Sequence, residues 1–443
     1  MLTARFLNTL FQAWDDAGIR FVVLRNYEGL PAIVGNDLDI LVDREKFLEA
    51  ERLALAAAKR TDFQLINRAE FSPVSLFFAH ETTGQQLHVD LFSDVKWRSV
   101  EILPPKALLD ARQARDNYYI PHPIHEAVVN LLTRLLFQGY TKSAYRPGIR
   151  AAFMAEPAAA HSALSELFGA QPAQDLIQKV LTDEWQEIEA QARRWRQLLV
   201  NRRVRKSPWR ALGSAVKDLV RLCRRFVMPP GMMIVILGPD GSGKSTVAAA
   251  LLQRLAQTFP RARSMHVHWK PTLFHRGNVA PNNISTPHGT PPRNAMASLA
   301  YFSFHLVEFI AGFELRLRPR LFRNGVVIVE RYYHDFFVDQ RRYRLNVPRP
   351  IVELGFHLVY KPDLAVVLDA PPAVLLGRKQ ELEPSEVLRQ RAAYIELAKR
   401  LQKTHIVDAS QPLEQVLERL ESIIVHQMSI RTKQRIKLKV VDE

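Results

Sequence analysis

Residues 238–245 read Gly-Pro-Asp-Gly-Ser-Gly-Lys-Ser, a spacing that is suited to holding a chain of phosphates. Glycines let the backbone curl so that successive N–H groups point inward, and a helix that follows adds partial positive charge. Lys244 is placed to reach the outer phosphates of ATP, and the Ser245 hydroxyl is placed to bind Mg²⁺. The alternative is an ordinary glycine-rich turn that contains a lysine.

The segments on either side of this loop favour the phosphate-binding interpretation. Residues 233–237 are an apolar run typical of a buried strand, and residues 247–255 have the pattern of a helix. Strand, glycine loop and helix in this order are the context that the motif requires. The predicted nucleotide-binding residues of the loop are Gly238, Gly241, Gly243, Lys244, Ser245 and Thr246.

A second group of chemically competent residues lies near the N-terminus. Asp37 and Asp39 stand two residues apart in a strand-like run, which places them on the same face. Asp90 lies in a later apolar run. Three carboxylates on neighbouring strands are suited to binding two Mg²⁺ ions, which activate an attacking hydroxyl and stabilise a leaving pyrophosphate.

The charge of the chain, +16 at pH 7, is concentrated in one segment. Residues 193–225 include twelve Lys or Arg and a single acid, Asp218. Aromatic and aliphatic residues are interleaved with these charges, so a basic helix that contacts an anionic membrane surface or nucleic acid is one interpretation. The other interpretation is a solvated helical linker between domains.

Length and composition limit the class of protein. A chain of 443 residues exceeds a single core, and 47% hydrophobic residues is ordinary for a soluble protein. The single cysteine, Cys223, excludes an intramolecular disulfide and a cysteine zinc site. We expect a cytoplasmic protein, because the first residues lack the apolar core of a signal peptide. The longest apolar stretch, residues 295–317, contains His305, Glu308 and Glu314, which favours a buried or amphipathic helix over a membrane span.

Hydrophobic periodicity and breaks in composition predict five zones and an α/β fold. The C-terminal part alternates short β-branched runs with helical patterns, which predicts a parallel sheet flanked by helices. The N-terminal part mixes helices and strands as in an α+β domain, and a helical segment follows it. The predicted zones are residues 1–120 (α+β domain), 121–200 (helical segment), 201–230 (basic linker helix), 231–427 (domain with the glycine loop) and 428–443 (basic tail).

Further motifs after the glycine loop support a family resemblance. A strand-like run ends in Glu330-Arg331-Tyr332, a second run covers residues 364–368, and a third covers residues 405–407. Together with the loop, these motifs resemble the thymidylate kinase family of P-loop nucleoside monophosphate kinases over residues 231–427. The resemblance is specific for the fold and less specific for the substrate.

This resemblance implies roles for residues near the transferred phosphate. Asp240 would face the phosphoryl acceptor, although a turn-forming role is the alternative. Glu330 would lie near Mg²⁺, through water, and Arg331 would bind the acceptor phosphate as a bidentate fork. A core salt bridge is the alternative for Glu330 and Arg331.

Other implied roles concern adenine and the lid. Arg378 resembles the residue that packs against adenine, and the turn of Asp408 and Ser410 resembles the loop beside it. Arg389 and Arg391 would neutralise charge on the transferred phosphoryl group. The alternative for both arginines is an exposed helix face.

The chain departs from the family pattern on the acceptor side. Thymidylate kinases usually carry Arg-Glu-Pro after the second strand, but this chain has His268-Trp269-Lys270-Pro271, so Lys270 replaces the acid. A Pro- and Asn-rich insertion follows at residues 278–292, and residues 333–344 are rich in aromatic residues and arginine. This pattern suits a phosphorylated or glycan-like acceptor.

Residues 18–95 resemble the polymerase-beta-type nucleotidyltransferase superfamily. The resemblance is carried by Asp37, Asp39 and Asp90, which it implies are metal ligands, and the helical segment fits the companion domain of that superfamily. The usual Gly-Ser before the Asp pair is missing, and Asn26 lies in the matching segment. A decayed or purely binding copy of the fold is the alternative.

The sequence thus supports three hypotheses. The first is an ATP- and Mg²⁺-dependent kinase that phosphorylates a small nucleotide or sugar-like acceptor. The second is a bifunctional nucleotidyltransferase and kinase that activates a metabolite in two steps. The third is a non-catalytic nucleotide-binding regulator that the basic linker holds at a membrane or on nucleic acid. A homodimer is a further expectation.

Overall fold

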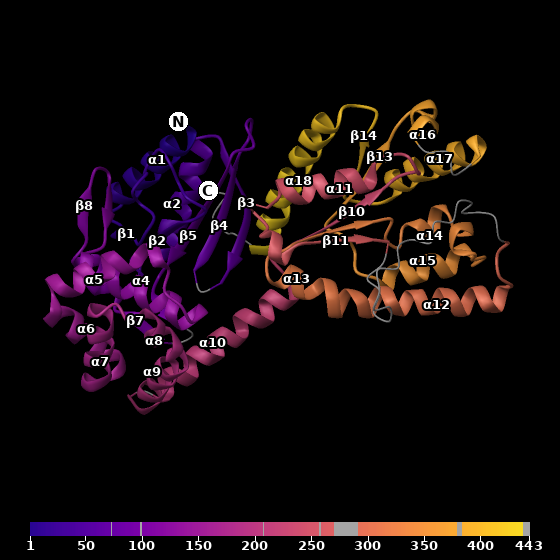
Figure 1. Cartoon of the computed structure of the whole chain (residues 1–443). Coiled ribbons are helices and arrows are strands. Elements are labelled where there is room, and N and C mark those ends of the chain that lie inside the picture. Colours follow the sequence, from indigo (N-terminus) through magenta and orange to yellow (C-terminus); the bar gives the residue numbers. More distant parts are fainter. Residues whose placement is uncertain are drawn as a thin grey trace. The chain divides into compact units, whose positions relative to one another are not determined.

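A computed structural model describes residues 1–71, 73–97, 100–206, 208–256, 258–269, 291–378 and 383–436. The chain divides into two compact units, Met1–Cys223 and Arg224–Leu438. Each unit contains a five-stranded sheet of its own (Figure 1).

The first unit begins with a mixed sheet in the order β1-β2-β5-β4-β3. Strands β2 and β5 are parallel, and the other neighbours are antiparallel. Its elements are α1 (Leu2–Asp16), β1 (Phe21–Val23), β2 (Leu38–Val42), α2 (Phe47–Arg60), β3 (Phe63–Glu70), β4 (Val74–His80), β5 (Gln86–Phe92), β6 (Val95–Trp97), β7 (Val100–Leu103), α3 (Pro105–Asp110), β8 (Gln113–Arg115) and β9 (Tyr118–Ile120).

Helices then follow one another to the end of the first unit. They are α4 (Pro123–Gln138), η1 (Ser143–Tyr145), α5 (Arg146–Ala155), α6 (Pro157–Phe168), α7 (Ala170–Leu181), α8 (Trp185–Ala190), α9 (Ala192–Lys206) and α10 (Pro208–Val227), which continues into the second unit. The helix α4 ends at Gly139, whose φ of 88° places it in the left-handed region.

Residue alternation in β2 assigns its two faces to two different cores. Ile40 and Val42 pack with α1 and α2, whereas Leu41 packs with the helical segment that starts at α4. Successive side chains of a strand point to opposite faces, so Asp39 shares the Leu41 face. The sheet therefore presents Asp39 on the side of the helical segment.

The second unit is a parallel sheet flanked by helices, as the sequence predicts. Its strand order is β11-β12-β10-β13-β14, and every neighbouring pair is parallel. Its elements are β10 (Met232–Leu237), α11 (Lys244–Arg254), η2 (Arg261–Arg263), β11 (Met265–His268), α12 (Ala295–Gly312), η3 (Phe313–Leu317), α13 (Arg318–Phe322), β12 (Val326–Glu330), α14 (Asp335–Val338), η4 (Arg341–Tyr343), α15 (Arg349–Leu358), β13 (Leu364–Asp369), α16 (Pro372–Arg378), α17 (Pro384–Arg400), β14 (Thr404–Asp408) and α18 (Leu413–Ile436).

The central strand β10 is buried on both faces, which explains its unbroken apolar sequence. Met233 and Val235 pack with Phe302 and Phe309 of α12. On the other face, α11 and α18 lie over the sheet (Figure 1). The carboxyl ends of the parallel strands meet at one edge, which is where sheets of this kind bind ligands.

The helix α18 runs beyond the point at which the sequence predicts a basic tail. Met428 and Thr432 are buried, and Nε of Arg431 lies 2.7 Å from Oδ1 of Asp363. These contacts with the rest of the unit explain why the helix continues to Ile436.

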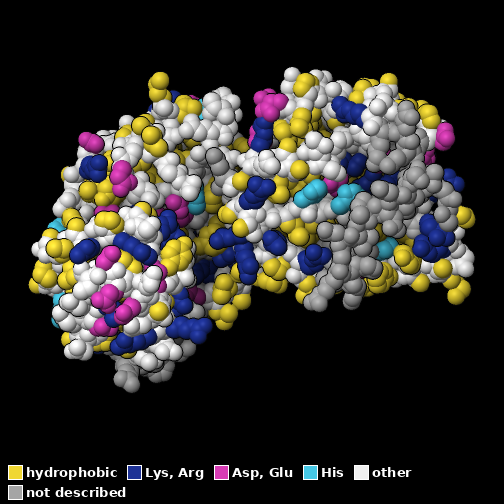
Figure 2. Space-filling model, in the orientation of Figure 1, with side chains coloured by type: hydrophobic (Ala, Val, Ile, Leu, Met, Phe, Trp, Pro, Cys, Tyr) yellow, Lys and Arg dark blue, Asp and Glu magenta, His cyan; other side chains and the backbone are white. Residues whose placement is uncertain are grey.

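One helical stretch among the described residues, Ala295–Phe322, is long and apolar enough for a membrane span by length and composition. Core helices of soluble proteins share this length and composition. Phe302 and Phe309 lie in the core, whereas Met296 and Val307 are exposed. Hydrophobic side chains are visible at the surface where α12 lies (Figure 2).

Candidate functional site

The glycine loop connects β10 to α11 in the second unit. Gly241 and Gly243 both have a φ of 84°, and Gly238 has a φ of 140°, so all three adopt conformations that L side chains rarely reach. A Cβ at Gly241 would lie 2.5 Å from the carbonyl oxygen of Leu375, whereas a Cβ at Gly243 would meet nothing within 4 Å. A Cβ at Gly238 would lie 2.5 Å from the carbonyl oxygen of Leu368. The loop therefore needs glycine for its backbone conformation and, at Gly238 and Gly241, also for a close approach.

Lys244, at the start of α11, is folded onto its own loop. Its Nζ donates to the carbonyl oxygens of Gly238 and Pro239 at 3.0 and 2.8 Å and lies 3.9 Å from Oδ1 of Asp240. Burial, helped by the charge of Arg331, lowers the pKa of Lys244 to about 7. The ammonium group is thus held where a phosphate chain in the loop would meet it.

Ser245 is exposed and donates its hydroxyl to Oε2 of Glu330 at 2.9 Å. The other oxygen of Glu330 lies 2.6 Å from Nε2 of His266, and Nε2 of His268 is 3.9 Å from Oε2. Burial acts to raise the pKa of Glu330, but the hydrogen bonds from His266 and Ser245 outweigh it and hold the pKa below its ordinary value. A hydroxyl beside an ionised carboxylate is a donor set that fits Mg²⁺.

Asp240 and Arg331 form a buried ion pair between the loop and the end of β12. Arg331 donates through Nη2 to Oδ1 of Asp240, and through Nη1 to Oδ2 of Asp335 at 3.2 Å. Burial acts to raise the pKa of Asp240, but the charges of Arg331, Lys244 and Arg342 hold it well below the ordinary value. Arg331 has a φ of 63°, in the left-handed region that few non-glycine residues adopt.

Three predicted residues lie together at the end of β14. Arg378 donates to the carbonyl oxygen of Ala409 at 2.9 Å. Asp408 accepts hydrogen bonds from the backbone N–H and the hydroxyl of Ser410, at 2.9 and 2.6 Å. Hydrogen bonds from Ser410 and Gln411 lower the pKa of Asp408. The structure therefore joins α16 to this turn.

Arg389 and Arg391 of α17, the two arginines predicted to act in the lid, contact groups outside the glycine loop. Arg389 donates to the carboxylate of Glu386 and to the carbonyl oxygen of Val338 at 3.0 Å. Arg391 forms two hydrogen bonds with Asp369, at 2.7 and 2.9 Å. Because Asp369 ends β13, Arg391 lies at the same edge of the sheet as the glycine loop. Lys270 and residues 278–290 of the insertion lie outside the described residues.

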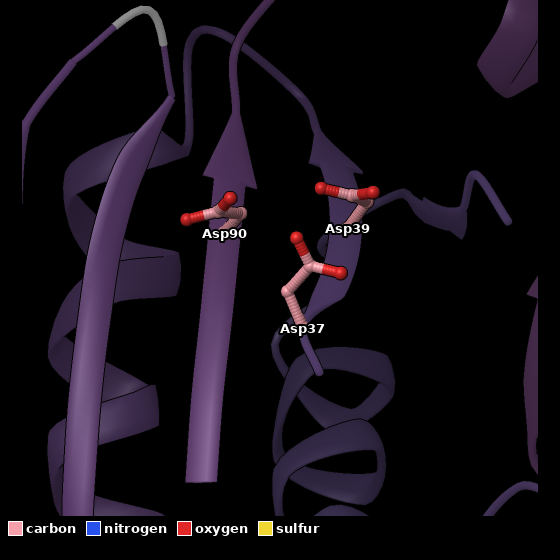
Figure 3. Close-up of side chains that lie close together, drawn as sticks. All are labelled: Asp37, Asp39 and Asp90. Carbon is pink, nitrogen blue, oxygen red and sulfur yellow. The ribbon is translucent and has the colours of Figure 1, made fainter. Parts of the chain in front are cut away.

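In the first unit, Asp37, Asp39 and Asp90 converge on one point (Figure 3). Asp37 immediately precedes β2, and Asp39 pairs in register with Asp90 of β5. Each offers a carboxylate oxygen within 4.8 Å of the others. Among the described residues this is the one group of three or more acidic, histidine or cysteine side chains arranged to hold a metal ion.

The buried member of this trio is held by a cation that the sequence did not single out. Asp39 is 1% exposed, its Oδ2 accepts a hydrogen bond from Nε of Arg25, and its Oδ1 has no hydrogen-bond partner. Burial outweighs the charge of Arg25 and raises the pKa of Asp39. Nε2 of His88 lies 2.9 Å from Oδ1 of Asp90. An orphaned carboxylate oxygen beside two further carboxylates fits a divalent cation.

Comparison with known proteins identifies the second unit. The family model described as thymidylate kinase matches residues 236–420. A thymidylate kinase of Leifsonia xyli subsp. xyli (strain CTCB07) is 30% identical over 209 residues, which are 42% of this chain and 91% of that protein. The chain belongs to the thymidylate kinase family. It is therefore a phosphotransferase of the nucleoside monophosphate kinase type.

Other thymidylate kinases are similar over the same share of the chain. That of Xylella fastidiosa (strain M12) is 26% identical over 212 residues, which are 46% of this chain and 92% of the relative. A crystal structure of thymidylate kinase from Ehrlichia chaffeensis is 17% identical with a TM-score of 0.32, and covers 44% of this chain and 100% of its own. Thymidylate kinases in general use ATP and Mg²⁺. Residues 1–235 and 421–443 lie outside the region that the family model matches.

The sequence does not single out several residues of the two sites. His266 and Arg342 in the second unit, and Arg25 and His88 in the first, belong to no motif of consecutive residues. Only the richness of residues 333–344 in arginine was visible in the sequence, and it does not distinguish Arg342 from its neighbours.

Proposed function

We propose that this protein is an ATP- and Mg²⁺-dependent kinase whose acceptor is a small nucleotide or sugar-like molecule. The observation that carries this proposal is the meeting of two loops at one edge of the sheet. The glycine loop after β10 contributes Asp240, Lys244 and Ser245, and the end of β12 contributes Glu330 and Arg331. These groups supply counter-charge for a phosphoryl transfer, in which positioning and electrostatics provide most of the catalysis.

The residues divide the work of binding and transfer between them. Backbone N–H groups of the glycine loop and Nζ of Lys244 would bind the ATP phosphates, and Lys244 would exchange its bonds to Gly238 and Pro239 for bonds to phosphate oxygens. Ser245 and Glu330 would hold Mg²⁺, which when bound neutralises charge on the β- and γ-phosphates. An acceptor oxygen then attacks the γ-phosphorus, and ADP leaves with the electrons of the broken P–O bond. Where the attacking oxygen belongs to a hydroxyl group, its proton passes to water.

Two features favour an acceptor other than thymidylate. The motif Arg-Glu-Pro is absent after β11, where this chain has Trp269 and Lys270. Trp269 stacks on Tyr343 with ring centroids 4.5 Å apart, and it forms a T-shaped ring contact with His305. Aromatic side chains at this position present flat apolar faces, which suit a sugar ring as well as a base.

A turnover screen tests the kinase proposal. Purified protein with Mg²⁺ and ATP is incubated with deoxynucleoside monophosphates, sugars, sugar phosphates and polyols, and ADP formation is measured by a coupled assay. We expect acceptor-dependent ADP formation that falls at least about a hundredfold in Lys244→Ala, because one preorganised charged donor is worth that much. Folding is followed by circular dichroism. Full turnover in Lys244→Ala, or no acceptor-dependent turnover across the screen, would contradict the proposal.

The carboxylate trio of the first unit supports a second candidate function, transfer of a nucleotide. The orphaned Oδ1 of Asp39 and the proximity of Asp37 and Asp90 favour binding of divalent cations there. In such a site the metal ions supply charge stabilisation for an attacking hydroxyl and a leaving pyrophosphate. With this site active, the protein would modify its substrate twice.

The second candidate is tested in the full chain with the kinase site disabled. In a Lys244→Ala background, pyrophosphate release is measured with each of four nucleoside triphosphates, and Mn²⁺ binding is measured by electron paramagnetic resonance. We expect both signals, and their loss in Asp39→Asn. Asp62→Asn is the matched control, because Asp62 is exposed and lies outside the trio. If Asp39→Asn and Asp62→Asn bind Mn²⁺ equally, the trio is not a metal site.

A further inference from the structure

A positive charge already lies among the carboxylates of the trio in the first unit. Arg25, which follows β1, donates from Nε to Oδ2 of Asp39, and its side chain is 16% exposed. Burial acts to lower the pKa of Arg25, but Asp39 and Asp37 are among the groups that raise it. Arginine stays protonated in proteins, so this charge is permanent. Arg25 is therefore a resident cation of the site at which β2 and β5 bring the carboxylates together (Figure 3).

The hydrogen bonds of the trio limit the oxygens that it offers to metal ions. Arg25 takes Oδ2 of Asp39, and Oδ1 of Asp39 is buried without a hydrogen-bond partner. Nε2 of His88 lies 2.9 Å from Oδ1 of Asp90, and the ring of His88 stacks on Phe77 with centroids 4.2 Å apart. Two metal ions that act together lie about 3.5 to 4 Å apart, a spacing that a carboxylate bridges with one oxygen on each ion. Asp39 has one oxygen left, so it can bind one ion but cannot bridge two.

The charges of the site lead to the same number of ions. Three carboxylates carry three negative charges, and Arg25 cancels one of them. One divalent cation neutralises the two charges that remain, whereas a second ion would add excess positive charge beside the guanidinium. Excess charge is costly where the groups are shielded from water, and Asp39 is 1% exposed. Geometry and charge thus both favour a single ion.

We propose that the trio binds one divalent cation and that Arg25 takes the place of the second ion of a two-ion site. The proposal rests on the metal-binding role proposed for the trio, and it replaces the pair of Mg²⁺ ions expected from the sequence by one ion and one arginine. Nη1 and Nη2 of Arg25 donate to no described residue, so their N–H groups remain for an anionic ligand of that ion.

Electron paramagnetic resonance of Mn²⁺ tests this inference without turnover, in the full chain and without nucleotide. An isolated Mn²⁺ ion gives the hyperfine pattern of a single centre, whereas two ions about 3.5 to 4 Å apart are spin-coupled and give a different spectrum. Ions at the trio are counted as the difference between the wild type and Asp39→Asn. We expect a difference of about one ion per chain and no spin-coupled signal, even at saturating Mn²⁺.

Substitution of the arginine should admit the second ion. Arg25→Met removes the charge and frees Oδ2 of Asp39, so we expect a spin-coupled pair of Mn²⁺ ions and a first ion that binds roughly tenfold more tightly or better. Arg25→Lys keeps the charge, and we expect it to bind a single ion. Arg5→Met is the matched control, because Arg5 forms an exposed ion pair with Asp62, and we expect its Mn²⁺ binding to equal that of the wild type.

Thermal melting shows whether each variant is folded. A spin-coupled pair in the wild type, or a single ion in folded Arg25→Met, would overturn the inference. If Arg25→Met does not fold, the spectra of the wild type and of Arg25→Lys still decide, because a spin-coupled pair in either contradicts a permanent charge in place of the second ion.

The outcomes distinguish this inference from the nucleotide transfer proposed for the same site. A spin-coupled pair in the wild type, with pyrophosphate release, would leave nucleotide transfer standing and end the role of Arg25. A single ion at the trio, with no pyrophosphate released from any nucleoside triphosphate, would leave the role of Arg25 standing and end nucleotide transfer. Equal Mn²⁺ binding by the wild type and Asp39→Asn would overturn the inference, and pyrophosphate release would then decide on nucleotide transfer by itself.

Discussion

Alanine substitutions at Gly241 and Gly243 separate two physical demands on the glycine loop. Both residues have a φ of 84°, so alanine at either position is forced into the left-handed region. That costs roughly 1 to 2 kcal/mol. A Cβ at Gly241 would also lie 2.5 Å from the carbonyl oxygen of Leu375, and such overpacking costs roughly 1 to 3 kcal/mol more. We therefore expect about 1 to 2 kcal/mol of destabilisation for Gly243→Ala, and about 2 to 5 kcal/mol for Gly241→Ala.

Native-state hydrogen exchange measures these losses locally, which suits a chain with two units. Amides of peptides from β10 and α11 report the free energy of opening around the loop, and peptides from the first unit serve as an internal reference. Affinity for an ATP analogue should fall further in Gly241→Ala than in Gly243→Ala, because the loop must shift to relieve the contact with Leu375. Equal losses in the two variants would refute the reasoning, because backbone conformation alone would then account for both.

Three further predictions concern charge and packing in the second unit. At pH 8, binding of an ATP analogue should take up nearly one proton, because Lys244 with a pKa of about 7 is then mostly neutral and becomes protonated beside the bound phosphates. Calorimetry in buffers of different ionisation enthalpy measures this proton uptake, which should vanish near pH 5.5. Phe309→Ala should lower the free energy of unfolding by about 3 to 5 kcal/mol, because Phe309 is buried in the core. Val307→Ala, on the exposed face of α12, should lower it by less than about 0.5 kcal/mol, and calorimetric unfolding measures both. Asp240→Asn should lower the free energy of unfolding by about 3 to 5 kcal/mol, because Arg331 and Arg342 lose a buried partner. Added phosphate should raise the melting temperature of this variant more than that of the wild type.

The sequence predicted those parts of the site that depend on consecutive residues. The glycine loop is such a part, since Gly238 to Ser245 and the apolar run before them are enough to define strand, turn and helix. The parallel sheet of the second unit was predicted for the same reason, because its strands are short β-branched runs between helices. The alternation of side chains along a strand indicates that Asp37 and Asp39 share a face, whereas their meeting with Asp90 depends on the pairing of β2 with β5.

The sequence does not predict contacts between segments that lie far apart in the chain. The order β11-β12-β10-β13-β14 depends on which strands pair, and a local pattern does not contain that information. Arg342 reaches Asp240 across 102 residues of sequence, and His266 reaches Glu330 across 64. Because arginine and histidine are common on surfaces, only the folded arrangement separates such residues from their neighbours.

Other expectations from the sequence stay predictions. The nucleotidyltransferase-like character of the first unit, the roles of individual site residues and the boundaries of the five zones are among them. So are a contact of the basic segment with a membrane surface or nucleic acid, a homodimer, and a cytoplasmic location.

The placement of β10 at the centre of its sheet bears on how such an enzyme changes over evolutionary time. The strand β10 is hydrogen-bonded to β12 on one side and to β13 on the other, which fixes the position of the loop that would bind ATP. Trp269 and Arg342, in contrast, lie in connections that leave the edge strand β11 and the strand β12. Substitutions in these connections can therefore change the acceptor while the residues that bind ATP stay the same.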